Sequence, residues 1–300
     1  MITEFFYNFY PSRILLDFGV VKIYWYGLFI FIGLVTSFIT YYFLSKKQNI
    51  EKNHIFDSFF WMILFGFIGA RLCYVLYYFS YYLKKPLEIF AFWDGGMAIF
   101  GGFIFGILAL FVYCKIKKQN IFKFLNIVSI SILIGQIIGR IGNYFNQELF
   151  GLPTNFFLKI PISLENRPIG FENYNFFMPI FFYEIFFNLI ILLILFLYYR
   201  KSIKNNLDQG MMMKNINVKT FRANMEKLTF IEKGGIFFIY INFYCLLRFI
   251  LEFFRLGENK FYGISYNQII IIFILFVFNG VWFFKIRRKP KIYPRMGTKN

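Results

Sequence analysis

The sequence predicts an all-α membrane protein with seven transmembrane helices. Of the 300 residues, 59% are hydrophobic and 25% are aromatic, and the mean hydropathy of +0.57 is far above that of soluble domains. Several apolar runs reach the ~20 residues that cross a bilayer. The alternating segments of a membrane β-barrel are not evident. Because lipid offers the backbone no hydrogen-bond partner, the apolar runs are expected to be helices.

Seven apolar segments are expected to span the membrane as one polytopic domain covering 1–300. In chain order these segments are 24–43, 55–79, 96–114, 121–142, 178–199, 234–255 and 266–284. Two connections differ from the rest. The outer segment 143–177 has prolines and glycines between short aromatic runs, which is typical of a small folded cap. The polar segment 200–233 is expected to be a cytoplasmic linker.

Basic residues mark alternate connections and thereby orient the chain. About two thirds of the 33 basic residues follow the first, third, fifth and last spans, beginning with Lys46, Lys115, Arg200 and Lys285. The positive-inside rule then places the N-terminus outside and the C-terminus in the cytoplasm. The net charge of +18 is explained by this topology, so no nucleic-acid partner is expected. The three cysteines lack paired spacing, so neither a disulfide framework nor a metal site is expected.

Polar residues gather where several spans reach the expected outer face. The stretch at 139–151 reads GRIGNYFNQELFG and places Arg140, Asn143 and Glu148 at the end of an apolar run. An ionisable group within a span costs several kcal/mol unless it faces a partner or a wet cavity, so each one indicates function. Further residues expected at this level are Tyr26, Arg71 and Glu184.

The sixth span carries a polar stripe near its outer end. Its sequence YCLLRFILEFFR repeats polar residues at intervals of four, four and three, which places them on one helical face: Tyr244, Arg248, Glu252 and Arg255. Arg248 and Glu252 could simply neutralise each other as an i,i+4 pair. The remaining arginines then outnumber the available acids, and such a surplus predicts an anionic ligand. Guanidinium forks match phosphate oxygens, so a phospholipid headgroup is expected.

Two glycine pairs lie at the same level, at 95–96 and 101–102. Each pair allows either the close approach of a ligand to the backbone or tight helix packing.

One stretch carries a family resemblance, GRIGNYFNQELFG at 139–151. Together with YWYGL, GARLCYVLYY, DGGMAIFGG and RFILEFFR in the same order, it resembles the prolipoprotein diacylglyceryl transferases, seven-span enzymes of the bacterial inner membrane. The resemblance implies transfer of a diacylglyceryl group from phosphatidylglycerol to the lipobox cysteine of a lipoprotein precursor. A thioether forms, glycerol phosphate leaves, no cofactor takes part, and the active site faces the outer leaflet. The implied site residues are Tyr26, Arg140, Asn143, Glu148, Gly151, Tyr244, Arg248 and Glu252.

Roles follow from this implied chemistry. Arg140 and Arg248 would stabilise the charge that grows on the departing phosphate. Tyr26 and Asn143 would orient the lipid headgroup, with Gly151 and Tyr244 also binding substrate. The carboxylates of Glu148 and Glu252 would hold the arginines in place, and either could accept a proton. The only histidine, His54, is expected on the cytoplasmic side, so the arginine field alone is expected to ionise the substrate thiol.

The sequence departs from the family pattern at two places. Phe100 stands where the family commonly has histidine, and Ile180 and Phe181 stand where it has a hydroxyl residue and glutamine. These departures leave open a diverged member with reduced activity. An anion or lipid transporter and a CDP-alcohol phosphotransferase are two further functions that a polytopic chain of this kind could have. The phosphotransferase would need several spaced aspartates for metal, which the lone Asp94 of this region cannot supply.

Overall fold

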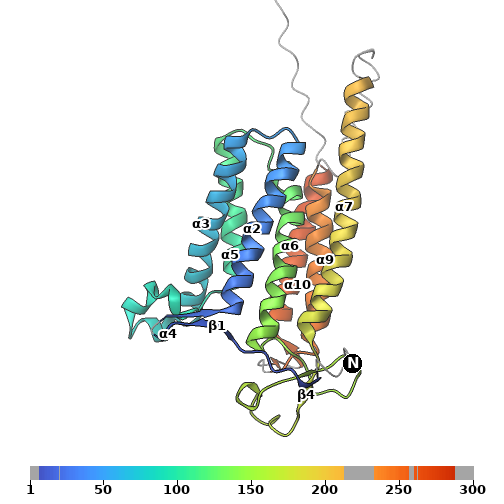
Figure 1. The fold of residues 1–300 in the computed structure, drawn as a ribbon. Helices are drawn as coiled ribbons and strands as arrows, with labels where there is room; N and C mark the ends of the chain where they lie inside the picture. Colours follow the sequence, from blue (N-terminus) through green and yellow to red (C-terminus); the bar gives the residue numbers. More distant parts are fainter. Residues whose placement is uncertain (1–6, 20, 213–232, 257–259, 262, 288–300) are drawn as a thin grey trace, which may run out of the picture. The chain divides into compact units, whose positions relative to one another are not determined.

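The computed structural model describes residues 7–19, 21–212, 233–256, 260–261 and 263–287. Within them, seven helices are long and apolar enough to cross a membrane (Figure 1). These are α2 (Trp25–Lys47), α3 (Lys52–Tyr77), α5 (Ile99–Ile116), α6 (Ile121–Asn146), α7 (Ile180–Met212), α9 (Gly235–Glu252) and α10 (Tyr266–Arg287). The mostly helical chain confirms the predicted fold class. The orientation of the termini stays a prediction.

Several helices continue beyond the predicted spans, because a helix follows its backbone hydrogen bonds rather than the hydrophobic boundary. Helix α2 reaches Lys47 instead of 43, and α10 reaches Arg287 instead of 284. Helix α6 continues beyond 142 to Asn146 and ends where Gln147 takes a positive φ of 50°. Helix α7 continues beyond 199 to Met212, so the first part of the expected linker is helical. The rest of that linker, 213–232, lies outside the described residues.

The chain divides into two compact units, which we describe separately. The first unit comprises Met1–Phe29, Gly139–Leu193 and Phe238–Asn300, and the second comprises Ile30–Ile138 and Ile194–Phe237. Helices α2, α6, α7 and α9 contribute residues to both units.

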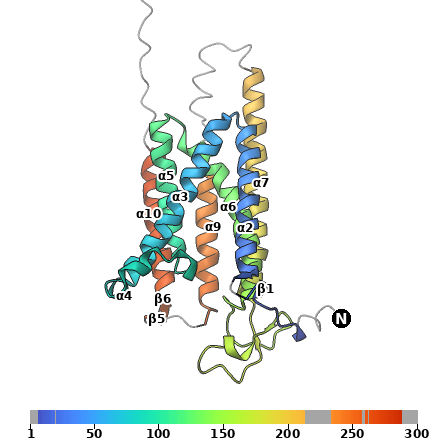
Figure 2. The ribbon, with the colours of Figure 1, turned by 60° about the vertical axis from the view of Figure 1, so that its left-hand side comes forward.

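In the second unit, α3 and α5 pack closely through glycines, and both views show them side by side (Figures 1 and 2). A Cβ at Gly69 would lie 2.3 Å from Cβ of Phe105, and a Cβ at Gly101 would lie 2.5 Å from the carbonyl oxygen of Gly69. Such distances leave room for no side chain, as in other small-residue interfaces between membrane helices. The glycine at 101 is therefore explained by helix packing. Beyond α3 follow α4 (Phe79–Tyr82), η1 (Pro86–Phe90) and η2 (Phe92–Asp94).

The first unit contains the N-terminal hairpin and the folded segment 143–177. Strands β1 (Ile14–Asp17) and β2 (Lys22–Tyr24) pair antiparallel and lead into α2. Within 143–177, β3 (Ile160–Pro161) pairs antiparallel with β4 (Phe176–Phe177), and η3 (Leu164–Asn166) lies between them. A buried apolar cluster supports this segment: Tyr144, Phe150, Ile160, Ile162, Phe177 and Phe181. A last short hairpin, β5 (Lys260–Phe261) and β6 (Ile264–Ser265), precedes α10.

Candidate functional site

Glu184 joins three helices of the first unit. Its side chain is 1% exposed, and its Oε1 lies 2.9 Å from Nη2 of Arg140 on α6. Its Oε2 lies 2.9 Å from Nη1 of Arg248 on α9. The hydroxyl of Tyr244, one turn before Arg248, donates to Oε1 at 3.4 Å. One carboxylate on α7 therefore fixes two guanidinium groups from different helices.

Glu252 forms a second centre on the same unit and is 2% exposed. It lies 3.4 Å from Nη2 of Arg248 and 3.4 Å from Nη1 of Arg255. Asn267 of α10 donates to it at 3.0 Å. The predicted stripe on α9 therefore exists, and Arg248 lies between two carboxylates. Arg248 lies closer to Glu184 than to Glu252, so the i,i+4 pair accounts for only one of its two ion pairs.

The stretch 139–151 forms a chain of polar contacts leading to Arg140. Asn143 accepts a hydrogen bond from Nη1 of Arg140 at 3.0 Å and donates to Oε1 of Glu148 at 2.7 Å. The turn that brings Glu148 back toward α6 needs two residues with positive φ, Gln147 at 50° and Leu149 at 56°. The backbone N–H of Glu148 then donates to the carbonyl of Asn143 at 3.1 Å.

We call these residues the arginine–glutamate network: Glu148, Asn143, Arg140, Glu184, Arg248, Glu252 and Arg255.

The arginines of the network are paired with glutamates, which differs from the surplus of unpaired arginines that the sequence predicts. The network's described side chains include three arginines and three glutamates, so their formal charges balance. Arg71, expected to share in the surplus, belongs to the second unit and donates to backbone carbonyls instead. The prediction of an unpaired arginine cluster is wrong because it omitted Glu184 as a shared partner. Of the three carboxylates, Glu148 alone has no arginine within ion-pair distance among the described residues.

One donor of the network lacks a partner. The Nε atom of Arg140 is buried and has no acceptor within the described part of the chain. Leaving a buried donor unsatisfied costs roughly 1–3 kcal/mol, and more for a charged group. Because the other edge of this guanidinium is fixed by Asn143 and Glu184, the Nε–H is available to a ligand oxygen that reaches it.

Two other implied site residues lie in the same unit. The ring of Tyr26 packs on Gly142, where a Cβ would lie 2.9 Å from its Cδ2. Gly142 immediately precedes Asn143 of the network on α6. Tyr26 is therefore beside the network, and its headgroup contact stays a prediction.

Gly151 has a structural reason to be glycine. Its N–H donates to the carbonyl of Met178 at 2.8 Å, and it pairs with Arg255 as an isolated bridge. A Cβ would lie 2.6 Å from the carbonyl oxygen of Phe254 and 2.8 Å from Cδ1 of Ile180. The glycine thus allows two chain segments to meet next to the network. A direct substrate contact at Gly151 stays a prediction.

Two members of the site, Glu184 and Asn267, are not among the site residues that the resemblance implies. Glu184 is expected at the right level but is not among the residues implied by the resemblance, although a carboxylate within a span is itself a strong signal. Asn267 lies in the stretch GISYNQ at 263–268, which also resembles the family, but one amide at the start of a span is by itself a weak signal.

The departures from the family pattern lie in both units, and burial in an apolar environment explains those at 180 and 181. Ile180 and Phe181 are 2% and 0% exposed, and Phe181 belongs to the apolar cluster of the segment 143–177. His54 lies in the second unit, where its Nδ1 is 2.8 Å from the Tyr113 hydroxyl. Phe100 occupies the first turn of α5 and is half-buried.

Metal binding receives no support from the described residues, which contain no group of three or more His, Cys, Asp or Glu placed to hold an ion.

Comparison with known proteins identifies the family of the chain. The family described as prolipoprotein diacylglyceryl transferase matches residues 13–284. A phosphatidylglycerol–prolipoprotein diacylglyceryl transferase of Prochlorococcus marinus (strain MIT 9215) is 33% identical over 81% of this chain and 78% of its own length. Enzymes of the same name from P. marinus subsp. pastoris and Synechococcus sp. (strain CC9902) are 37% and 38% identical, each over 67% of this chain and 72% and 73% of their own lengths. The chain belongs to the prolipoprotein diacylglyceryl transferase family.

Proposed function

We propose that this protein transfers the diacylglyceryl group of phosphatidylglycerol to the cysteine thiol of a prolipoprotein. The family match and the names of its relatives support this activity. The observation that carries it in the structure is Glu184 holding Arg140 and Arg248 in fixed positions on different helices. Two guanidinium forks held in this way suit a phosphate group, because each can present paired donors to its oxygens.

The reaction forms one bond and breaks another at the same carbon. The thiolate sulfur attacks the saturated glycerol carbon of the diacylglyceryl group, and the bond from that carbon to the phosphate oxygen breaks. The electron pair goes to the phosphate, which leaves as glycerol phosphate with one more negative charge. Arg140 and Arg248 would stabilise this charge, and stabilisation by donors already in place is the largest single contribution in many enzymes.

Glu148 is the residue that we assign to the thiol proton. A balanced network weakens the expected role of the arginine field, so a base is needed. Glu148 accepts a hydrogen bond from Asn143 but has no arginine partner in the described residues, whereas Glu184 and Glu252 each bind two arginines. A carboxylate that binds arginines gives up its charge at a greater cost than one that does not.

The substrate and the location are proposed from the same chemistry. The acceptor is the lipobox cysteine of a secreted precursor, and the partners are phosphatidylglycerol and the surrounding membrane lipid. Seven apolar helices indicate a multi-pass membrane protein. We assign it to the bacterial inner membrane with the network facing the outer leaflet.

The test combines purified protein, phosphatidylglycerol vesicles and a synthetic lipobox peptide, with detection of the adduct by mass spectrometry. We expect a mass increase of one diacylglyceryl group and equimolar glycerol phosphate. The peptide with serine in place of cysteine should give no adduct, and Arg248→Ala should abolish transfer while the protein still folds. Uptake of lipid or anion into vesicles, without adduct, would favour a transporter, which neither the family nor the relatives favour.

A further inference from the structure

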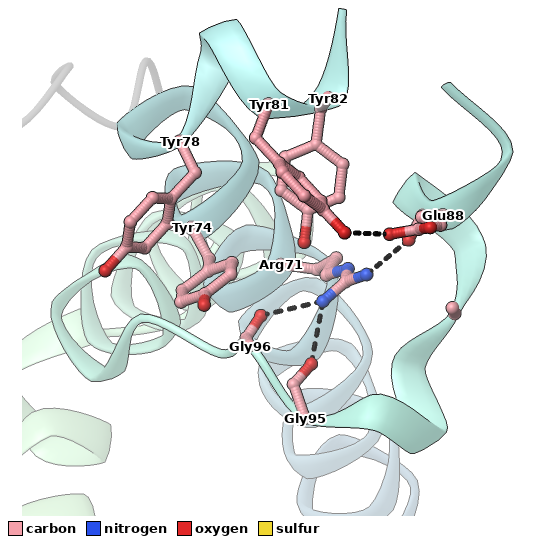
Figure 3. A pocket seen from close by; sticks show the side chains of 9 residues that line it. Arg71, Tyr74, Tyr78, Tyr81, Tyr82, Glu88, Gly95 and Gly96 are labelled. Atoms are coloured by element: carbon pink, nitrogen blue, oxygen red, sulfur yellow. Dashed lines mark hydrogen bonds between the residues drawn. The ribbon is translucent and has the colours of Figure 1, made fainter. Parts of the chain in front are cut away.

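A cavity of about 310 Å³ lies in the second unit and shares no residue with the arginine–glutamate network. It is formed where α3 ends and α4 and η1 begin, and the backbone at 95–96 closes one side (Figure 3). Its lining consists of one arginine, four tyrosines, one glutamate and small residues: Arg71, Tyr74, Tyr78, Tyr81, Tyr82, Glu88, Ala91, Gly95 and Gly96. The volume is that of a site for a small ligand.

Arg71 provides a buried positive charge to this cavity. Its side chain is held by backbone carbonyls: Nε donates to Ile89 at 2.9 Å, Nη1 to Gly95 at 2.7 Å and to Gly96 at 3.0 Å, and Nη2 to Glu88 at 2.5 Å. The residue is only 4% exposed, and no carboxylate pairs with it among the described side chains. Carbonyl dipoles solvate a cation without cancelling its charge, so an anion in the cavity would be attracted.

The nearby carboxylate of Glu88 does not neutralise Arg71. The Tyr81 hydroxyl donates to Oε2 of Glu88 at 2.5 Å, and Nζ of Lys85 lies 2.9 Å from Oε1. The Tyr81 hydrogen bond, and then Lys85, hold the pKa of Glu88 below its usual value, so it stays ionised and paired. Together these described charges sum to +1, with Arg71 as the unmatched one.

Three tyrosine hydroxyls remain as donors. Tyr74, Tyr78 and Tyr82 line the cavity, and their hydroxyls make no hydrogen bond to another described residue. The rings of Tyr74 and Tyr82 flank Arg71, with centroids 6.0 and 5.5 Å from its Cζ (Figure 3). Because Arg71 already occupies the aromatic faces, a second cation would be repelled, while an anion that accepts from the hydroxyls would be stabilised.

The backbone at 95–96 approaches Arg71 and Tyr74 closely, which holds the buried arginine at the cavity wall. Gly95 and Gly96 have φ values of 80° and 70°, which a residue with a side chain adopts only with strain. A Cβ at Gly96 would lie 2.6 Å from the Tyr74 ring and 2.7 Å from Nη1 of Arg71. An aromatic belt at a membrane surface would explain the tyrosines but not this glycine pair or the buried arginine.

The neighbouring residues indicate that the cavity opens near lipid headgroups. Helix α3 is a candidate span that ends at Tyr77, next to the cavity. The short helices beyond it expose Leu87, Phe90 and Trp93 to 85%, 68% and 82%. Large apolar side chains on a segment that follows a span are typical of insertion at the bilayer interface.

We propose that the Arg71 cavity binds a glycerol-phosphate group, supplied either by an anionic phospholipid headgroup or as free glycerol phosphate. The phosphate would accept from the tyrosine hydroxyls near Arg71, and the glycerol would pack on the rings. The glycerol part rests on the proposed function, since phosphatidylglycerol carries this group and the reaction releases it. The phosphate part rests on the cavity alone.

The test compares Tyr74→Phe/Tyr82→Phe with Tyr77→Phe. The double variant removes two hydroxyl donors and keeps both rings, whereas Tyr77 is 77% exposed and does not line the cavity. Both are made in an Arg140→Gln background, so that the network contributes less to binding. Each purified protein is titrated with glycerol phosphate in detergent, and with phosphatidylglycerol or phosphatidylcholine nanodiscs. We expect the double variant to bind about 10- to 100-fold more weakly, from the usual range for two hydrogen bonds, and Tyr77→Phe to bind normally.

The source of the ligand follows from which titration responds. Weaker binding by the double variant in either titration, or in both, supports the proposed cavity. The titration in which binding weakens identifies the source: the lipid headgroup for nanodiscs, and the free compound for glycerol phosphate. Equal binding by the double variant and Tyr77→Phe overturns the proposal. Binding of neutral glycerol as tight as that of glycerol phosphate also overturns it. A photoreactive headgroup analogue provides a measurement on the unaltered protein: it should label the peptide 71–96, and labelling only elsewhere overturns the proposal. The peptide-transfer assay is separate, so loss of transfer with intact cavity binding refutes only the proposed function.

Discussion

Replacing Glu184 with glutamine tests whether one carboxylate sets the positions of both phosphate-binding arginines. Glu184→Gln preserves side-chain size but leaves a single acceptor oxygen where two oxygens now meet Arg140 and Arg248, each at 2.9 Å. The amide group would face one of these arginines with its own donors. At least one guanidinium must therefore turn away, and the network gains one positive charge.

The magnitude follows from what is lost. A hydrogen bond to a charged group contributes about 1.5–3 kcal/mol to stability. Breaking a buried pair by removing one partner costs about 3–5 kcal/mol, which is the upper bound here because the amide keeps one contact. In the reaction, loss of one aligned donor to a developing anion costs about 2.7–4 kcal/mol, or 100- to 1,000-fold in kcat. We therefore expect a fall in kcat of that size in protein that still folds.

The assay measures the initial rate of peptide modification per folded protein, with thermal unfolding measured alongside. Glu165→Gln is the matched control, because Glu165 is exposed on the segment 143–177 and the substitution makes the same chemical change. It should leave transfer unchanged. Glu184→Asp keeps the charge but shortens the reach, so its rate should fall between the two. A folded Glu184→Gln protein with a rate near that of the unaltered enzyme would refute the assignment.

Four further predictions use the same assay or cells that express the protein. Arg140→Lys should lose most transfer, because a lysine offers a point charge without the fork that reaches both Asn143 and Glu184, and recovery of half the rate would contradict this. His54→Ala should transfer normally per folded protein, because His54 contacts Tyr113 in the second unit; a large loss would give it a role in the reaction. A cysteine at 167 should react with an impermeant thiol reagent in intact cells and one at 204 should not, and the reverse pattern would invert the topology. Glu148→Gln should lower kcat at neutral pH and recover it at alkaline pH, and a loss that persists at alkaline pH would exclude the base.

Most of the fold follows from the sequence, because hydrophobic length is nearly sufficient to place membrane helices. All seven expected spans match helices of the described chain, and the stripe on α9 is present. Helix ends were harder to predict, because α6 continues through polar residues that find partners in the turn beyond it. The side of the membrane on which each end lies stays a prediction from charge.

The partners within the site could not be predicted in the same way. Arg140, Glu184 and Arg248 come from three helices, and which carboxylate meets which arginine depends on packing that no local pattern encodes. The pattern indicated depth but not pairing, and it therefore overestimated the free positive charge. Arg71 shows the same limit, since its acceptors are backbone carbonyls that carry no sequence signal.

Charge balance explains why Glu148 should matter beyond its hydrogen bond to Asn143. The thiol loses one proton as the phosphate gains one negative charge, so a neutral network would face the leaving group without net attraction. If Glu148 takes the proton, its own charge disappears, and the network becomes positive in the same step in which the phosphate becomes more negative. Glu148→Gln fixes the positive state in advance. It should therefore bind phosphatidylglycerol more tightly, with a lower KM, while kcat falls for lack of a base. Alkaline pH should restore kcat by ionising a thiol of ordinary pKa, ~8.5, without raising KM. A variant that loses affinity and kcat together would show instead that Glu148 only supports Arg140 through Asn143.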